Sequence, residues 1–567
     1  MAFTGLSSTT RTPLACFSDP IFLSSCMQDA PRTACTMPLT RICQLPQALF
    51  LTCLFASASL SGAPLPGLQA ALDTGTPSEA PQDLFKQIEN KIKLQKLSNG
   101  LEVIMLDQEL APVSALYIKI LAGGADETQR TAGIAHMLEH MLFKGTEKIG
   151  TRNYEAEKKY LELIQIWSRD LDHWRMELEK AREAQDASAI KEAESKVNLW
   201  KFRLQLAMKE AARFRIPEED SLLYSKHGQR GYNAYTSRDL TNYQIQLPSN
   251  RIEVWAAIES DRLKNSVFRE FYTERDVVTE ERRMRVENVA SSKLMENFLI
   301  EIYGDHPYGK PLIGPMKSIE YFNKEDAVDF YKKYYSPNNA VIAVTGDFDP
   351  EFAMQVIEKH FGSWKSGPVI ERPDPEEPAR RKVSIELKEK GSPVMYMAWF
   401  KPALLHPDSL KLEVLGSILA DGQESILVQK LIREKKLATS IRIYTGFPGE
   451  RFTNLFFISA VPAPDVKYDT LETAILEEIE NVKHKGISEK HLKKVQKKAL
   501  SDFAFGLRSP AKLADLLSYY QIMTGDYRTL FRSYEQLENI QVAEVQEAAR
   551  QYLKPEWIMK ARLIGED

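Results

Sequence analysis

The chain has 567 residues, enough to bury a sizeable core and to form more than one domain. Its formal net charge is −4 with 27% charged residues, a balance that argues against a nucleic-acid-binding protein. All five cysteines lie within the first 53 residues, so the rest of the chain has neither a disulfide nor a cysteine nucleophile. They are Cys16, Cys26, Cys35, Cys43 and Cys53.

Residues 1–70 differ in composition from the rest and are expected to form a leader. Starting at Met37, the cationic Arg41, an apolar run and small residues suited to cleavage predict a secretory signal peptide. The mature protein is then periplasmic or secreted, and the apolar run is too short for a stable membrane span. Residues 1–36 are interpreted as an unused upstream start. Their Ser, Thr and Arg content leaves an organelle transit peptide as the alternative.

Strands are expected next. Residues 92–106 and 112–121 are rich in alternating and β-branched residues, and Gly123 and Gly124 end the second run. Residues 235–247 alternate in the same way and predict one further strand. Together with the helical segments between them, these runs indicate an α+β layer.

Residues 133–143, GIAHMLEHMLF, follow a helical period. His136 and His140, at i and i+4, therefore project from one face about one turn apart. Glu139 lies on nearly the same face, where a carboxylate can act on a metal-bound water without being a ligand. This is the inverted zinc motif H-x-x-E-H, whose metal needs a third protein ligand. The alternative is a chance pattern with two hydrogen-bonded core histidines.

A candidate for the third ligand lies in a second charged helix. Glu274 and Glu281 share a helical face with Val277 and Val278, so we expect both carboxylates to point inward. Glu280 is rotated by about 100° from Glu281 and should face solvent. The alternative is an exposed helix carrying Glu–Arg pairs.

An antiparallel helical hairpin is expected over 155–215. Apolar residues repeat every seven positions in two runs, separated by a break at 184–188. We expect the hairpin to project from the metal-bearing domain, with its tryptophans in the seam, and to be dispensable for the chemistry. The repeats are Ile164, Leu171 and Leu178 with Trp167 and Trp174, then Ile190, Val197 and Leu204 with Trp200 and Ala207.

The second half is interpreted as a degenerate copy of the first. A proline-rich linker, 367–381, separates a metal-bearing domain, 85–366, from a C-terminal domain, 382–567. The segments KEDAVDFYKKYYSPNNAVIAVTGD and VAEVQEAARQYLKPEWIMKARLIGED match helix for helix and strand for strand, which indicates a duplication. In the second copy, LKLEVLGSILADG takes the place of the metal helix without a histidine, so one Zn²⁺ per chain is expected.

Five motifs stand in order along the chain: GIAHMLEHMLFKGT, YNAYTSRDLTNYQIQLP, ESDRLKN, ERDVVTEERR and YYSPNNAVIAVTGDFDP. Through them, residues from about 90 onward resemble the pitrilysin, insulysin and mitochondrial processing peptidase family of zinc metallopeptidases, the inverzincins. The spacing between the second histidine and the ligand glutamate is about twice the usual one, and the hairpin accounts for the excess. The resemblance implies two homologous domains, each a mostly antiparallel sheet with helices packed on one face, that face each other as a clamshell.

The resemblance also implies roles for individual residues. In the edge strand that clamps substrate, Asn233 and Ala234 match the family motif. The second domain supplies an arginine, matched by Arg433 in LIREKKLATS, and a tyrosine, where this chain has Thr439. Arg433 could equally be a solvated helix residue, and Tyr444 is a possible substitute for the tyrosine. By position, the zinc ligands are His136, His140 and Glu281, with Glu139 as general base and Glu274 as supporting carboxylate.

The sequence thus predicts a zinc-dependent endopeptidase that hydrolyses extended peptides or unfolded polypeptides. We expect a homodimer, or a heterodimer with a related subunit, as a possible assembly. The alternative is a subunit of a paired processing-peptidase-like complex whose role is mainly scaffolding and substrate binding.

Overall fold

The structure is a computed structural model that describes residues 81–109 and 111–565. All of these belong to one compact unit within Pro46–Asp567. The predicted signal peptide and leader, 1–70, lie outside the described residues. In the described part of the chain, no helix is both long and apolar enough to cross a membrane.

The first sheet has six strands in the order β1-β2-β6-β3-β5-β4. β2 and β6 run parallel, and the other pairs are antiparallel. One expectation is wrong: 235–247 is not a single strand, because the chain reverses at 237–240. There the Ser237 hydroxyl accepts the amides of Asp239 and Leu240. The strands are β1 (Lys93–Lys96), β2 (Glu102–Asp107), β3 (Val113–Ile120), β4 (Arg230–Thr236), β5 (Thr241–Pro248) and β6 (Ala340–Gly346).

The second sheet has the order β7-β11-β8-β10-β9. Without β1, the first sheet has the same order and the same single parallel pair, at β2–β6 and β7–β11. The predicted duplication and fold class are therefore confirmed. Residues 365–382 join the two sheets without a helix or strand. The strands are β7 (Val383–Lys388), β8 (Val394–Lys401), β9 (Ala438–Phe447), β10 (Asn454–Pro462) and β11 (Met559–Ile564).

Helices cover the sheets because alternate strand residues are apolar. On β3, Leu116, Ile118 and Ile120 are buried in a core shared with α3 and α7. In the N-terminal half the helices are α2 (Pro81–Lys91), α3 (Ile134–Leu142), α4 (Tyr154–Glu183), α5 (Ala187–Ala211), α6 (Glu219–Lys226), α7 (Ile252–Asn265), α8 (Phe271–Arg282), α9 (Ala290–Tyr303), α10 (Met316–Tyr321), α11 (Lys324–Tyr334) and α12 (Pro350–Phe361). In the C-terminal half they are α13 (Pro407–Ala420), α14 (Tyr468–Lys485), α15 (Glu489–Gly506), α16 (Pro510–Thr524), α17 (Thr529–Asn539) and α18 (Val542–Tyr552).

One helix from each half also packs against the sheet of the other half. Helix α16 lies on β3 and β6, where the small residues Ala115, Ala343 and Ala514 allow close approach. Helix α9 lies on β7 and β11 in the same way. The sheets thus carry helices on a second face, in addition to the covered face that the sequence predicts.

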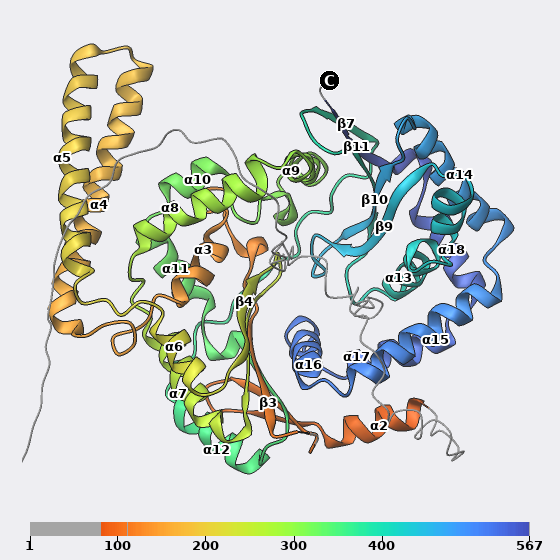
Figure 1. Cartoon of the computed structure of the whole chain (residues 1–567), viewed down its shortest axis with the longest axis horizontal. Helices are drawn as coiled ribbons and strands as arrows, with labels where there is room; N and C mark the ends of the chain where they lie inside the picture. Colours follow the sequence, from red (N-terminus) through yellow and green to blue (C-terminus); the bar gives the residue numbers. More distant parts are fainter. Residues whose placement is uncertain (1–80, 110, 566–567) are drawn as a thin grey trace, which may run out of the picture. The chain divides into compact units, whose positions relative to one another are not determined.

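The predicted hairpin is formed by α4 and α5, which run side by side (Figure 1). Its seam is filled by leucines and alanines such as Leu171, Leu178 and Leu204. The tryptophans lie half-buried, and Lys196 covers the ring of Trp174. Their predicted place inside the seam is therefore wrong, because leucines and alanines fill the seam while the tryptophan side chains remain partly exposed.

The first half of α4 contacts the rest of the N-terminal half through buried polar side chains. Glu157 forms a buried ion pair with Arg269 at 2.6 Å, and Ser168 hydrogen-bonds Tyr272. Deleting 155–215 would leave a buried arginine without its partner, at a cost of about 3–5 kcal/mol.

Trimming only 173–197 to a short Gly/Ser loop should avoid this cost. We expect the trimmed protein to keep its fold, measured by thermal unfolding, and to match the full-length protein in metal analysis and in a short-peptide assay, where the sequence predicts zinc and turnover. Deletion of 155–215 serves as the comparison and should unfold at a lower temperature. A trimmed protein without zinc would show that the outer hairpin supports the metal centre.

Candidate metal centre

Two residues outside the H-x-x-E-H motif, Gly133 and Glu127, stabilise the N-terminus of α3. Gly133 has φ 98°, and a Cβ there would lie 2.2 Å from the Ile313 carbonyl oxygen, so only glycine fits. The buried carboxylate of Glu127 accepts the amides of Gly133 and Ala135, each at 2.8 Å. Burial raises the pKa of Glu127 to about 8, opposed by these two hydrogen bonds. Glu127 thus fixes the helix that carries the histidines.

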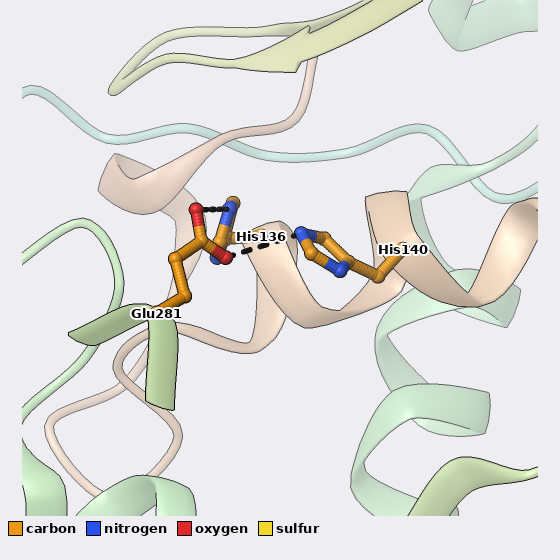
Figure 2. A group of neighbouring side chains, drawn as sticks. All are labelled: His136, His140 and Glu281. Carbon is orange, nitrogen blue, oxygen red and sulfur yellow. Dashed lines mark ion pairs between the residues drawn. The ribbon is translucent and has the colours of Figure 1, made fainter. Parts of the chain in front are cut away.

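His136, His140 and Glu281 form a compact cluster. Figure 2 shows both imidazoles facing the carboxylate of Glu281. The Nε2 atoms of His136 and His140 lie 3.7 and 3.5 Å from the two oxygens of Glu281. All three potential ligand atoms lie within 4.8 Å of one another, and in the part of the chain that the structure describes this is the one such cluster.

The cluster fits a tetrahedral zinc ion. Zn–N and Zn–O bonds of about 2.1 Å place neighbouring ligand atoms about 3.4 Å apart, close to the two distances between the histidines and Glu281. Two imidazoles and one carboxylate are a catalytic donor set, which leaves one coordination position for water. Burial holds the pKa of His136 well below its usual value, which keeps this candidate ligand neutral and able to bind metal.

The buried face of helix α8 includes fewer residues than the sequence predicts. The Glu281 side chain is 15% exposed and that of Glu280 62%, so the expected difference between these neighbours is present. Val278 is fully buried, but Val277 is 47% exposed, and its predicted inward orientation is wrong. The helix packs along the line of Glu274, Val278 and Glu281, and Val277 lies at the edge of this line.

Glu274 supports the cluster from behind. Its Oε1 lies 2.9 Å from Nδ1 of His140, and its Oε2 lies 2.5 Å from Nζ of Lys144. With Nε2 facing Glu281, Nδ1–H donates to Glu274, which fixes the tautomer and the ring. Although burial alone would raise it, the hydrogen bonds from His140 and Lys144 lower the pKa of Glu274. The carboxylate is therefore charged at neutral pH.

Replacing Glu274 by glutamine should weaken zinc binding by about 10- to 100-fold without abolishing it. The amide still accepts a hydrogen bond but has no charge to hold the imidazole. Competition with a zinc chelator measures the affinity, and Glu253→Gln, at an exposed glutamate of α7, is the control. Unchanged affinity in Glu274→Gln would contradict the supporting role.

Glu139 lies beside this cluster and is held by a residue that the sequence analysis missed. The Thr236 hydroxyl, at the end of β4, donates to Oε2 of Glu139 at 2.6 Å. Burial raises the pKa of Glu139, opposed by this hydrogen bond. A raised pKa suits a group that must accept and release a proton near neutrality. Thr236 lies within the motif YNAYTSRDLTNYQIQLP, but nothing in that motif indicated that this threonine contacts Glu139.

The residues expected to contact substrate lie on β4 in the first half, and on β9 and the segment just before it in the second half. Asn233 and Ala234 lie on β4, the last strand of the first sheet, which packs beside α3. Arg433 is exposed and donates to Gln423 at 2.5 Å within its own segment. Thr439 lies on β9 and is also exposed. Arg285 Nη1 lies 2.9 Å from Oε1 of Glu281, which places a cation beside the cluster.

Fold and site together define a duplicated α+β protein that, within the residues described, brings the inverted motif and Glu281 together as one group of potential metal ligands. Two family models match it: "Insulinase (Peptidase family M16)" over 102–164 and 218–316, and "Peptidase M16 inactive domain" over 321–499. The gap in the first match falls on the hairpin. The chain belongs to peptidase family M16.

Individual relatives agree with this assignment. The zinc protease PqqE of Helicobacter pylori is 24% identical over 81% of this chain and 89% of its own length. A probable mitochondrial-processing peptidase subunit beta of Arabidopsis thaliana is 21% identical over 81% of this chain and 76% of its own. A crystal structure of a Helicobacter pylori protease has a TM-score of 0.68 at 23% identity, over 84% and 99% of the two chains.

Proposed function

We propose that this protein is a zinc-dependent endopeptidase of extended peptides or unfolded polypeptides. One observation carries the proposal: Nε2 of each histidine and the carboxylate of Glu281 lie at zinc-ligand spacing, with Glu139 adjacent. The name zinc protease carried by several relatives supports it.

In this proposal His136, His140 and Glu281 hold one Zn²⁺. When bound, the ion acidifies a water molecule and polarises the peptide carbonyl. Glu139 accepts a proton from the attacking water and passes it to the nitrogen of the leaving amine. Thr236 holds one oxygen of Glu139, so the other oxygen is free to carry the proton.

The substrate would add to the edge of the first sheet. β4 pairs with β5 along one side, so its other side offers backbone groups to an extended peptide. Asn233 and Ala234 lie on this strand, next to helix α3, which carries the two histidines of the motif. Backbone pairing reads peptide conformation more than side chains, which favours unfolded substrates over folded ones. For Arg433 we propose a contact with the substrate backbone.

We also propose that the protein is exported and that Met37 begins its signal peptide. The periplasmic protease PqqL from Escherichia coli has the same fold, with a TM-score of 0.61 at 17% identity. An assembly of two chains, alike or related, is proposed because one relative is named as a subunit of a processing peptidase.

The test combines metal analysis with cleavage of a random peptide library by the purified protein. We expect about one zinc per chain and chelator-sensitive cleavage. A mainly scaffolding subunit would show neither, and that result would overturn the proposal. The complete donor set in this chain favours the catalytic role.

A further inference from the structure

The β4–β5 turn, 237–240, lies between the proposed general base and the C-terminal half. At its start, the buried Thr236 hydroxyl donates to Glu139 at 2.6 Å. Inside the turn, the Ser237 amide donates to the Leu240 carbonyl at 2.8 Å, and the Ser237 hydroxyl bonds the amides of Asp239 and Leu240. The turn is therefore compact, and Asp239 lies within it three residues after Thr236.

Asp239 is anchored by the β9–β10 loop, 448–453, of the C-terminal half. Its Oδ2 accepts the amide of Glu450 at 2.6 Å and that of Arg451 at 3.3 Å. Its Oδ1 accepts the hydroxyl of Tyr308 at 2.6 Å. Asp239, Glu450 and Tyr308 are all buried, so these charge-assisted bonds form away from water, where they are strong.

The same loop also binds the segment 124–126, which in turn contacts the β4–β5 turn. The Arg451 guanidinium pairs with both oxygens of Asp126, each at 3.2 Å. Two residues before Asp126, the amide of Gly124 donates to the Ser237 carbonyl at 3.0 Å, and that of Ala125 donates to the Arg238 carbonyl at 2.8 Å. The turn is thus held from two sides by one loop of the second half.

Close approach of this loop depends on Gly449. A Cβ at this position would lie 2.7 Å from Oδ2 of Asp239 and 2.6 Å from the Tyr308 hydroxyl. Alanine at 449 would therefore push the loop away from the turn. This gives a way to break the contact from the C-terminal side without touching the N-terminal half.

We infer that the metal-free second half positions the general base: its β9–β10 loop fixes the β4–β5 turn through Asp239, and the turn orients Glu139 through Thr236. The inference rests on the proposed peptidase function and adds Thr236 and Asp239 as positioning residues. It assigns the second copy a positioning role that needs no metal of its own.

Thr236→Val removes the hydroxyl while keeping the shape of the side chain. Loss of one hydrogen bond to a carboxylate should lower kcat by about 10- to 100-fold, with KM and zinc content nearly unchanged. Thr236→Ser should restore most of kcat. The control is Thr241→Val, which removes a buried hydroxyl of the same hairpin that donates to the Ala122 carbonyl and not to Glu139. Equal kcat values for Thr236→Val and wild type would overturn the role of Thr236.

Gly449→Ala and Asp239→Ala break the same contact from opposite sides. Each should lower kcat, and hydrogen exchange at the amides of 237–240 should become faster. Combining Gly449→Ala with Thr236→Val should lower kcat no further than Thr236→Val alone, because both act through Glu139. The control is Glu102→Ala, which removes a different contact between the halves, with Gln521 at 2.8 Å. Fully additive losses, or unchanged exchange in Gly449→Ala, would overturn the coupling.

Two readouts do not depend on turnover. In metal-free protein, Thr236→Val should lower the melting temperature less in a Glu139→Ala background than in wild type, since the hydrogen bond is already gone. The exchange of 237–240 likewise needs no substrate. If wild-type protein cleaves no peptide, the proposed function fails, while these two measurements still decide whether the second half holds the turn and the turn holds Glu139.

Discussion

Glu139→Gln is expected to retain zinc and to lose about 10²-fold or more of its peptide turnover. The amide keeps the size of the side chain and can still accept the Thr236 hydrogen bond, but it cannot take a proton from water. The three ligand side chains are untouched, so metal analysis should give the wild-type content.

The matched control for this change is Glu280→Gln, at the exposed neighbour on α8. It removes a carboxylate close in sequence to the cluster without touching a ligand or the base, so both zinc and turnover should stay at wild-type values. Wild-type turnover by purified Glu139→Gln would show that another group is the base.

Glu281→Ala is expected to empty the metal site, whereas Glu280→Ala should leave it filled. The reason is the orientation of the two side chains: that of Glu281 is 15% exposed and faces both imidazoles, whereas that of Glu280 is 62% exposed and pairs with Arg283. Loss of one of three protein ligands should weaken zinc more than the 10- to 100-fold typical of a supporting residue such as Glu274.

Zinc content after dialysis, together with competition against a chelator, measures this difference. Loss of zinc without loss of folding, checked by circular dichroism, is the expected result for Glu281→Ala. Equal occupancy in the two alanine variants would exclude Glu281 as the third ligand.

Local periodicity was informative wherever a single element decides the outcome. A four-residue spacing on a helix brings His136 and His140 to one face whatever surrounds them, because 3.6 residues make one turn. The same reasoning separates Glu281 from Glu280. It fails for Val277, since the width of a buried helical face depends on which neighbours pack against it. It fails again at 237–240, where side-chain hydrogen bonds of Ser237 reverse the chain within an alternating run.

Helix and strand periodicity could not predict contacts between segments that are distant in sequence. Glu127 caps α3, Thr236 reaches Glu139 across 97 positions, and Asp239 meets Glu450 across 211. None of these residues belongs to a type or spacing that marks its partner. The tryptophans of the hairpin show the same limit, because a heptad pattern predicts a seam but not which side chains it can hold.

The sequence by itself determined the elements whose geometry is local, namely the helix that carries His136 and His140, the inward orientation of Glu281 on α8 and the α4–α5 hairpin, and it also indicated the duplication. Only the tertiary structure decided that Glu274 lies behind His140 and that helices α9 and α16 cross between the halves. It alone also decided that a loop of the second half holds the turn next to the proposed base. The physical reason is that helix and strand periods constrain neighbours within about one or two turns, whereas long-range pairs depend on how complete faces pack and on which buried polar groups find partners there.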